Sequence, residues 1–396
     1  MSASTPAYFN NAAKARFDPT VVATALAQIQ KDPWEMDVET DKQKIRELYA
    51  DIVGAEGASH IAIMPSTAFA ITLAAENLKH TAKPGKILLL QDQYPSAVYP
   101  WQEVCQTSHG KFSLEVIPYP EKEETWTSLI LQRLNQGNIS IACLPPLFWC
   151  DGSLIDLEKI GPICKDKGIT LIVDGTQAAG IYPLNVQAIH CSMMACSVHK
   201  WLRGPSGTCL VYLDASAIQE WQPLDQHDRA RDWKGRSVAD RNTMTPNGYP
   251  TKFVTGARKL DAGGRSQPLL VPMLRAALEK VHQIDTIQAQ SELQSLVQPL
   301  RDWARANPHV HDLLSNGHAS HILGLMPQSS LSAEQMLEYA KQLADDFHVI
   351  VAVRCGVFRI SPYLDNTAAE VMQLINALEA KLSANSKSKV STCRLS

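Results

Sequence analysis

The sequence of 396 residues lacks several features that would place it in other classes of protein. It has no pair of cysteines spaced C-x-x-C, so neither a zinc site nor a redox dithiol is favoured. Its nine cysteines stand mostly alone in apolar stretches, which predicts reduced, intracellular cysteines that pack as small apolar side chains. No apolar run approaches the length of a membrane span, and the N-terminus "MSASTPAYFNNAAKARF" has no apolar segment typical of a signal peptide. We therefore expect a cytoplasmic protein without a membrane partner.

An excess of charge of one sign is also missing. The formal net charge is −3, and the basic residues are scattered, which excludes the Lys/Arg stripe of a nucleic-acid groove. The end of the chain, "SANSKSKVSTCRLS", is rich in Ser and Lys and predicts a disordered tail at 385–396. Its last four residues, from Cys393, fit the prenylation pattern only loosely because an arginine follows the cysteine, so we expect no lipid anchor.

Short apolar runs and helical patterns alternate through the first two thirds of the chain. The expected helices include 66–80 and 156–168, and the expected strands are 60–65, 85–90, 113–119, 139–145, 169–174, 191–197 and 207–213. Apolar runs of this length between helices are typical of a parallel sheet covered on both faces. The sequence therefore predicts an α/β fold around a mostly parallel sheet of about seven strands.

From about residue 270 the pattern changes. A long helix is expected over 270–306, followed by helices at 332–347 and 367–382 and strands at 320–327, 349–354 and 357–362. Helices with a small, antiparallel sheet predict a second, α+β domain. We expect an N-terminal segment (1–20) near the active site, a large domain (21–268) and a smaller C-terminal domain (269–384).

Polar residues stand at three points where an expected strand ends. Asp174 closes the run "ITLIVD", where an acid either caps a following helix or supplies a functional charge. Lys200 comes 26 residues later at another strand end, where a lone lysine usually extends into solvent. Ser66 and Thr67 open a helix, so Ser66 is either a simple N-cap or part of an anion site. Sites in open parallel sheets lie at the carboxyl ends of the strands, so the three features are expected together.

Together these residues fit the chemistry of pyridoxal 5′-phosphate. This cofactor needs a lysine for a Schiff base, an acid against its pyridine nitrogen and donors for its phosphate. The lysine must be neutral to attack an aldehyde, and burial lowers the pKa of a lysine toward that form. Gln177 can donate to the 3′-oxygen of the ring, while Ser197 and His199 can reach the phosphate.

The segments "VDGTQAAG" and "SVHKWLRGPSG" at this separation resemble fold-type I pyridoxal-phosphate enzymes, specifically the class V aminotransferase superfamily. That group includes cysteine desulfurases, isopenicillin-N-epimerase-like proteins, kynureninase-like enzymes and C–S lyases. The resemblance extends from "YFNNAA" to "FRISPYLDNT", nearly the whole chain. It implies that Lys200 carries the cofactor, that Asp174 partners the pyridinium nitrogen and that Gln177 bonds the 3′-oxygen.

The same resemblance implies further contacts with the cofactor. Tyr94 falls where relatives stack an aromatic residue on the ring, although a turn tyrosine is the alternative. The phosphate cradle would comprise Ser66, Thr67, Ser197 and His199. A loop of the second subunit completes this cradle in the superfamily, and "GGRSQ" matches that loop, which implicates Arg265 or Ser266 and a homodimer.

Two arginines near the end of the match are candidates for the substrate. Arg359, in "VFRISPY", resembles the arginine that binds the α-carboxylate of the substrate; the alternative is a strand arginine paired with an acid. Arg354, five residues earlier, is interpreted as structural.

The sequence departs from cysteine desulfurases at two points. Their nucleophilic cysteine lies on a loop that is reduced here to "CGVF", and Cys355 is interpreted as a packing residue. Where they carry an asparagine, "LPPLFWCDG" has prolines, Phe148 and Trp149. This wall predicts a substrate with an aromatic or imidazole part or a closed pocket, unless Trp149 is ordinary core.

Three functions remain open from the sequence. The first is an aminotransferase acting on a small amino acid, and the second is a β-eliminating C–S lyase acting on a cysteine-derived substrate. The third is a cofactor-binding protein with little catalysis, which the complete set of cofactor residues disfavours. A desulfurase or an epimerase is expected less. Nothing in the sequence selects a general base among three histidines, His190, His227 and His321.

Overall fold

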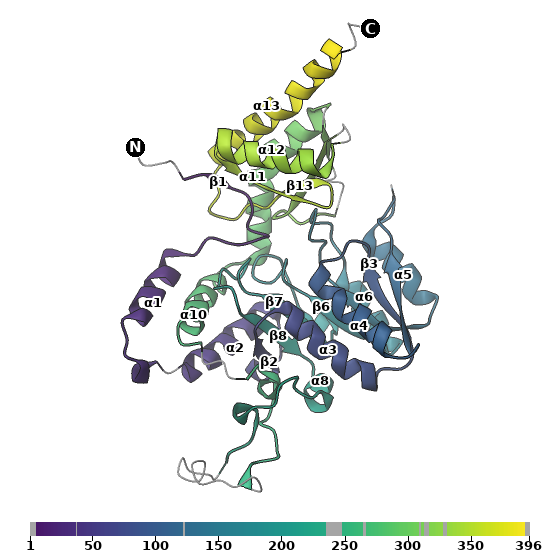
Figure 1. Ribbon diagram of the computed structural model, residues 1–396, viewed down its shortest axis with the longest axis vertical. Coiled ribbons are helices and arrows are strands. Elements are labelled where there is room, and N and C mark those ends of the chain that lie inside the picture. Colours follow the sequence, from purple (N-terminus) through teal and green to yellow (C-terminus); the bar gives the residue numbers. More distant parts are fainter. Residues whose placement is uncertain are drawn as a thin grey trace.

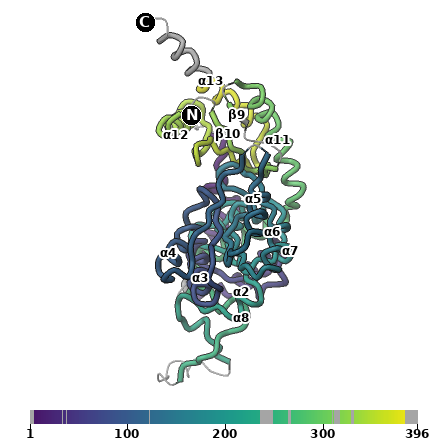
Figure 2. The backbone as a smooth tube through the Cα atoms, turned by 90° about the vertical axis from the view of Figure 1, so that its right-hand side faces the viewer, coloured from purple at the N-terminus to yellow at the C-terminus, as the bar shows by residue number. Residues whose placement is uncertain are grey.

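The computed structural model describes residues 5–36, 38–121, 123–234, 248–263, 267–308, 310–312, 317–327 and 331–392. Two bodies are visible in it, a broad one around the larger sheet and a narrower one that carries α12 and α13 (Figures 1 and 2). None of the helices in these described ranges combines the length and the apolar character needed to cross a bilayer.

The larger sheet has seven strands in the order β2-β8-β7-β6-β5-β3-β4. They are β2 (Ile61–Met64), β3 (Gly85–Leu90), β4 (Phe112–Ile117), β5 (Ile139–Leu144), β6 (Thr170–Asp174), β7 (Met193–Ser197) and β8 (Cys209–Leu213). Only β8 runs against its neighbours, β2 and β7, while the other pairs are parallel. The predicted α/β fold with a mostly parallel sheet is therefore confirmed.

Helices cover both faces of this sheet, as the uninterrupted apolar strands require. In β6, Leu171 and Val173 belong to one core cluster, whereas Ile172, between them, belongs to the cluster on the opposite face. The first cluster includes residues of α2 (Glu39–Val53), α5 (Trp126–Asn135), α6 (Leu157–Asp166), α7 (Val186–Ile189) and α10 (Leu270–Val281). The second includes residues of α3 (Thr67–Thr81), α4 (Tyr99–Thr107) and α8 (Ala215–Glu220). Helix α1 (Pro19–Ile29) packs on α10.

A second, antiparallel sheet has the strand order β12-β13-β10-β9. Its strands are β9 (Val310–Asp312), β10 (Leu323–Pro327), β12 (Ala352–Arg354) and β13 (Val357–Ile360). They share a separate core with α11 (Thr286–Ala306), α12 (Ala333–Phe347) and α13 (Ala368–Thr392). The chain start joins this body, because β1 (Ala7–Tyr8) pairs in parallel with β11 (Val349–Ile350).

Two expectations for the second half of the chain were wrong. The long helix expected over 270–306 is two helices, α10 and α11, because Asp285 ends the run by accepting hydrogen bonds from the N–H groups of Ile287 and Gln288. Helix α13 extends to Thr392, into the tail expected to be disordered, and the stretch 383–392 contains no glycine or proline that would stop it. Cys393 lies outside the described residues.

Candidate active site

A cavity of about 200 Å³ lies where β6 and β7 end and helix α3 begins. Eight residues predicted from the sequence line it: Ser66, Thr67, Tyr94, Asp174, Gln177, Ser197, His199 and Lys200. They come from four separate stretches of the chain, and the parallel order of the strands brings them to one edge of the sheet. The structure therefore assembles the predicted cofactor residues around one enclosed space. The predicted loop residues Arg265 and Ser266 lie outside the described residues.

Lys200 follows β7 by three residues, and its side chain is buried, with 9% of the residue exposed. Burial, opposed by the charge of Asp174 and aided by that of Arg359, lowers the pKa of Lys200 from 10.5 to about 8. Its Nζ lies 5.1 Å from the centre of the Tyr94 ring. A solvent-exposed role for this lysine is therefore wrong, and a sizeable fraction of the amine is neutral near pH 8.

Asp174 is the last residue of β6 and is buried at the same cavity. Its Oδ1 accepts a hydrogen bond of 3.1 Å from the N–H of Thr176, in the turn that follows the strand. The next α-helix along the chain, α7, begins only at Val186, so Asp174 is not a helix cap. A buried carboxylate on the wall of the cavity fits the acid that the pyridine nitrogen requires.

The amide of Gln177 is held in one orientation by its neighbours. The indole N–H of Trp201 donates to Gln177 Oε1 at 2.8 Å, and Gln177 Nε2 donates to the carbonyl of Ala12 at 3.1 Å. Since an amide nitrogen carries two N–H donors, one remains for a ligand. Gln177 therefore fits the predicted partner of a ring oxygen.

Hydroxyl groups gather at the N-terminus of α3. Thr67 Oγ1 lies 2.8 Å from Ser197 Oγ, and the N–H of Ser197 donates to Thr176 Oγ1 at 3.1 Å. Ser66 caps the helix by accepting a hydrogen bond from the N–H of Phe69 at 3.1 Å. It therefore serves as an N-cap and also lines the cavity. Hydroxyls beside a helix N-terminus fit an anion such as a phosphate. Thr176 was missed from the sequence, although it stands in "VDGTQ" between two residues that were singled out.

His199 lies on the wall of this cavity. Burial and the neighbouring charge of Lys200 lower the pKa of its imidazole, which favours the neutral form. A neutral ring can donate one hydrogen bond to a phosphate from whichever nitrogen carries the proton.

Two aromatic residues meet on the wall of the cavity. Tyr94 and Trp149 pack edge to face, with ring centres 5.4 Å apart and planes at 78°. The indole N–H of Trp149 donates to the carbonyl of Asp92 at 2.9 Å, which holds the ring at the cavity wall. Phe148 points the other way, into the core of the large body, where it contacts Tyr119. Trp149 thus lies on the wall of the cavity and is not ordinary core, whereas Gln93 and Ser96 are cavity residues that were missed from the sequence.

Arg359 stands on β13 and reaches the site through Trp149. The residue is 1% exposed; its guanidinium donates to the carbonyl of Trp149 at 3.1 Å and to Asn10 Oδ1 at 3.4 Å, and its Nε has no partner. Burial and the charge of Arg354 lower the pKa of Arg359 to about 9. Within the described residues it forms no ion pair, so pairing with an acid, the alternative from the sequence, is not observed.

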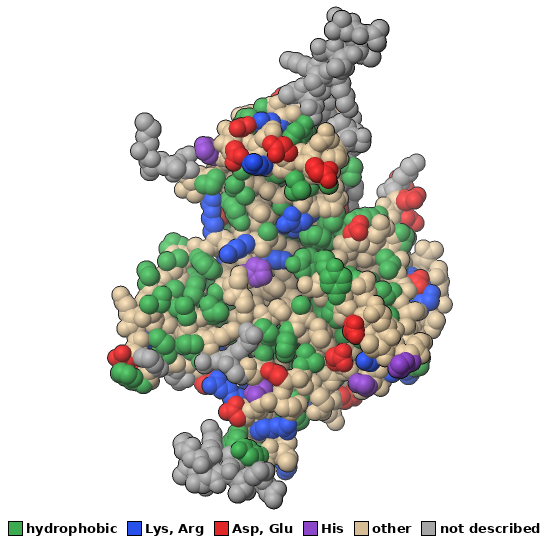
Figure 3. Space-filling model, in the orientation of Figure 1, with side chains coloured by type: hydrophobic (Ala, Val, Ile, Leu, Met, Phe, Trp, Pro, Cys, Tyr) green, Lys and Arg blue, Asp and Glu red, His purple; other side chains and the backbone are tan. Residues whose placement is uncertain are grey.

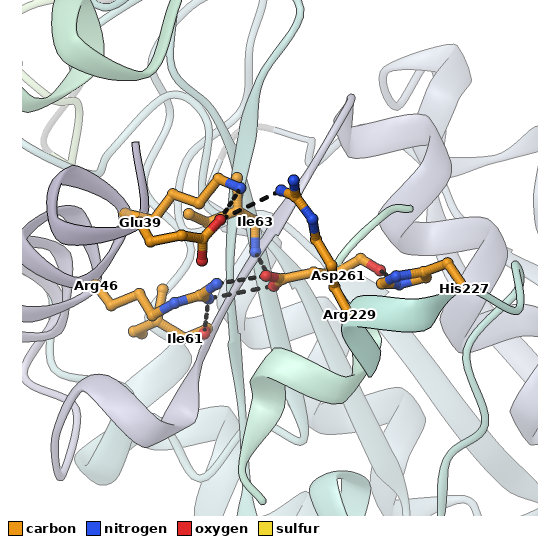
Figure 4. A network of polar contacts seen from close by, with 8 residues as sticks. Glu39, Arg46, Ile61, Ile63, His227, Arg229 and Asp261 are labelled. Atoms are coloured by element: carbon orange, nitrogen blue, oxygen red, sulfur yellow. Dashed lines mark hydrogen bonds and ion pairs between the residues drawn. The ribbon is translucent and has the colours of Figure 1, made fainter. Parts of the chain in front are cut away.

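None of the three candidate histidines lines the cavity. His190 is exposed at the end of α7. His227 belongs to a polar network around Asp261 and Arg46 on another side of the large sheet (Figure 4). His321 is fully buried and donates to the carbonyl of Gln177 at 2.7 Å; burial lowers its pKa to about 4, so it is neutral and supports the wall of the site.

The expectation that the cysteines are all reduced was wrong. Cys150 and Cys355 form a disulfide between Cα atoms 6.0 Å apart, across 205 residues of sequence. Cys355 is therefore not a packing residue but a covalent link between the β12–β13 turn and the segment that carries Trp149. Six other cysteines in the described part of the chain are free, and five of these are buried, as expected for small core residues.

Comparisons with known proteins agree with this geometry. The chain is 24% identical over 342 residues to the uncharacterized aminotransferase YcbU of Bacillus subtilis (85% of this chain, 82% of the relative). It is similar to the solved structure of a cysteine desulfurase from Thermococcus onnurineus NA1, with a TM-score of 0.80 and 19% identity over 95% of this chain and 94% of the other. The complex of the cystine C–S lyase C-DES with cysteine persulfide gives a TM-score of 0.80 at 17% identity, covering 95% and 97%.

These structural likenesses, at low identity, show the shared fold. The family model described as Aminotransferase class-V matches residues 8–374, which include every described residue assigned to the site. The chain therefore belongs to the class-V aminotransferase family and is a pyridoxal-phosphate-dependent enzyme.

Proposed function

We propose that this enzyme transfers the amino group of an α-amino acid. The observation that carries the proposal is a buried guanidinium without an acidic partner, Arg359, which contacts the wall of the cavity that holds Lys200 and Asp174. An arginine fork binds a carboxylate through two parallel hydrogen bonds and so orients the Cα atom of an amino acid.

The side chains at the cavity have distinct tasks in this reaction. Bound pyridoxal phosphate supplies an electron-withdrawing ring that weakens the bonds at the substrate Cα. The carboxylate of Asp174 keeps a proton on the ring nitrogen, and the amine of Lys200 removes and returns a proton at Cα. Tyr94 and Trp149 present aromatic rings to the cavity, which limits its contact with water.

The second candidate is a β-eliminating C–S lyase, favoured by the shared fold with a cystine C–S lyase. Transfer is proposed first because it is the reaction that the description of the matching family model names. A cysteine desulfurase is disfavoured, because Cys355, the candidate nucleophile, is bonded to Cys150.

A half-reaction separates the two candidates. The holoenzyme is incubated with single amino acids, without a 2-oxo acid, and its absorbance is followed. Transfer predicts one equivalent of 2-oxo acid, loss of the yellow absorbance, and its return when a 2-oxo acid is added. Continuous release of pyruvate and ammonia would instead support the lyase, and no reaction with any amino acid would contradict both.

We also propose that the working form is a homodimer. Helix α1 and the residues around it expose large apolar side chains, namely Phe17, Val22, Leu26, Ile29 and Trp34, next to the visible apolar surface of the large body (Figure 3). Burial of such a patch against a second copy removes apolar surface from water. Sedimentation of the wild type and of Leu26→Glu measures the oligomeric state. The proposal predicts that the wild type is a dimer and that the charged variant dissociates more readily.

The cytoplasmic location stays a prediction. The disulfide between Cys150 and Cys355 argues against it, since disulfides are rare in the cytosol.

A further inference from the structure

A second arginine lies on the same sheet face as Arg359. In the β12–β13 hairpin, Arg359 pairs with Ala352 and Arg354 pairs with Val357. Directly paired residues of antiparallel strands place their side chains on one face, and residues two apart in a strand share that face. Arg354 and Arg359 are therefore diagonal neighbours on one side of the hairpin.

Arg354 is partly buried and has no acidic partner within the described residues. Its hydrogen bond within the described chain is from Nη1 to the carbonyl of Val353 at 2.7 Å, and it takes part in no ion pair there. By contrast, Arg46, Arg133, Arg203 and Arg275 each pair with an Asp or Glu. Removing a guanidinium from water costs free energy unless an anion pairs with it. Arg354 is therefore suited to an anion that a ligand supplies.

The charge of Arg354 contributes to the lowered pKa of two neighbouring groups. After burial, it is the next cause that lowers the pKa of Arg359, and it also contributes to the lowered pKa of Lys200. Two positive side chains on one face, close enough to affect each other and the amine, form an anion-binding surface wider than a single carboxylate needs.

Two neighbours of Arg354 border an open space. Val357, its cross-strand partner, and Cys355, the next residue in the chain, line a cavity of about 900 Å³ at the junction of the two bodies. Asp151 also lines this cavity, but its Oδ1 accepts from the N–H and Oγ of Ser153 at 2.9 and 2.8 Å, and it forms no ion pair with Arg354.

The disulfide fixes the hairpin at this place. Cys355 directly follows Arg354, and its bond to Cys150 ties the turn to the residue next to Trp149, whose carbonyl holds Arg359. Both guanidinium groups are thus carried by one short hairpin that is anchored at its turn and at β13.

We propose that Arg354 binds the side-chain carboxylate of a dicarboxylic amino acid, aspartate or glutamate, while Arg359 binds its α-carboxylate. This inference rests on the proposed function, in which an amino acid donates its amino group at this cavity. A second charge-assisted contact selects such a substrate over alanine, since only the dicarboxylate supplies both anions.

Binding of unreactive acids to the holoenzyme tests the inference directly. Calorimetric titration compares succinate, with two carboxylates, and propionate, with one. We expect Arg354→Gln to weaken succinate binding about tenfold or more and to leave propionate unchanged, and Arg354→Lys to keep part of the preference. The control Arg229→Gln, whose wild-type residue pairs with Glu39 away from the cavity, should change neither. Equal weakening of both acids by Arg354→Gln, or no effect on either, would overturn the inference.

Kinetics separate this inference from the proposed function. Faster transfer from aspartate or glutamate than from alanine, with the preference lost in Arg354→Gln, supports both. Equal kcat/KM for all three amino acids would overturn the inference and leave transfer standing. Absence of transfer from any amino acid would overturn the proposed function, and the succinate titration would then decide the role of Arg354 alone.

Discussion

The two bodies of the molecule contribute different kinds of residue to the site. The seven-stranded body supplies Lys200, Asp174 and Gln177 from the ends of buried parallel strands, together with hydroxyls that already bond to one another. The four-stranded body carries Arg359, which contacts the cavity wall at Trp149, and Arg354, which we propose as a second substrate contact; neither has an acidic partner within the described residues. The first arrangement is pre-organised for one constant ligand, whereas the second leaves positive charge for whichever anion binds. We infer that the larger body determines the cofactor and the smaller one the substrate.

The largest expected effect comes from the larger body. Replacing Lys200 with Ala should remove the borohydride-reducible link to the cofactor and lower kcat by at least about 100-fold, because the base at Cα is lost. Mass spectrometry after reduction measures the link. Lys259 provides a matched control: it is also buried, with a pKa lowered by burial, but its Nζ donates to the carbonyl of Gln219 at 3.3 Å, away from the cavity. A stable reducible adduct in Lys200→Ala but not in Lys259→Ala would reverse the assignment.

The second largest effect is expected for a residue of the smaller body, Arg359. Arg359→Ala should raise KM for an amino acid about 10- to 100-fold, because a hydrogen bond to a charged group contributes about 1.5–3 kcal/mol. Cofactor binding, followed by absorbance during dialysis, should stay unchanged. Arg359→Lys, which keeps the charge but loses the fork, should be intermediate. If Arg359→Ala released the cofactor and left KM unaltered, the division of roles between the bodies would be wrong.

Removing the covalent link between the bodies should have a smaller effect on chemistry and a measurable one on stability. Cys355→Ser is expected to lower the free energy of unfolding by about 2–4 kcal/mol, because the disulfide constrains the unfolded chain. Denaturant unfolding measures this loss. Cys105→Ser, at a partly buried free cysteine, serves as the control and should change little. A titration that found two additional free thiols in the native wild type would contradict the link.

The smallest expected effect is on the pH dependence of the rate at which the apoenzyme binds pyridoxal phosphate. Because only the neutral amine attacks an aldehyde, capture of pyridoxal phosphate by the apoenzyme should speed up as pH rises and level off above about 8, the pKa of Lys200. With an unperturbed lysine, the rate would continue to rise until the pH reached the ordinary lysine pKa of 10.5. Stopped-flow absorbance across this range distinguishes the two profiles. A rate still rising tenfold per pH unit between 9 and 10 would mean that burial does not perturb this amine.

The strands of the larger body were predictable because each is a short, uninterrupted apolar run between helices. The same reasoning found Asp174 and Lys200, since a charged residue directly after a buried run is conspicuous. It failed at the junction of α10 and α11, where one capping residue, Asp285, outweighed a continuous amphipathic pattern. It also missed Thr176, whose hydroxyl matters only because the fold brings Ser197 beside it.

By itself, the sequence determined the α/β architecture, because this depends on local patterns of apolar and polar side chains, and it indicated the family through the resemblance of two motifs. Only the tertiary structure decided that Cys150 meets Cys355, that Trp149 packs against Tyr94 at the cavity and that Arg354 shares a face with Arg359. Such pairings depend on strand register and on contacts between segments far apart in the chain. No periodicity within a single segment encodes them.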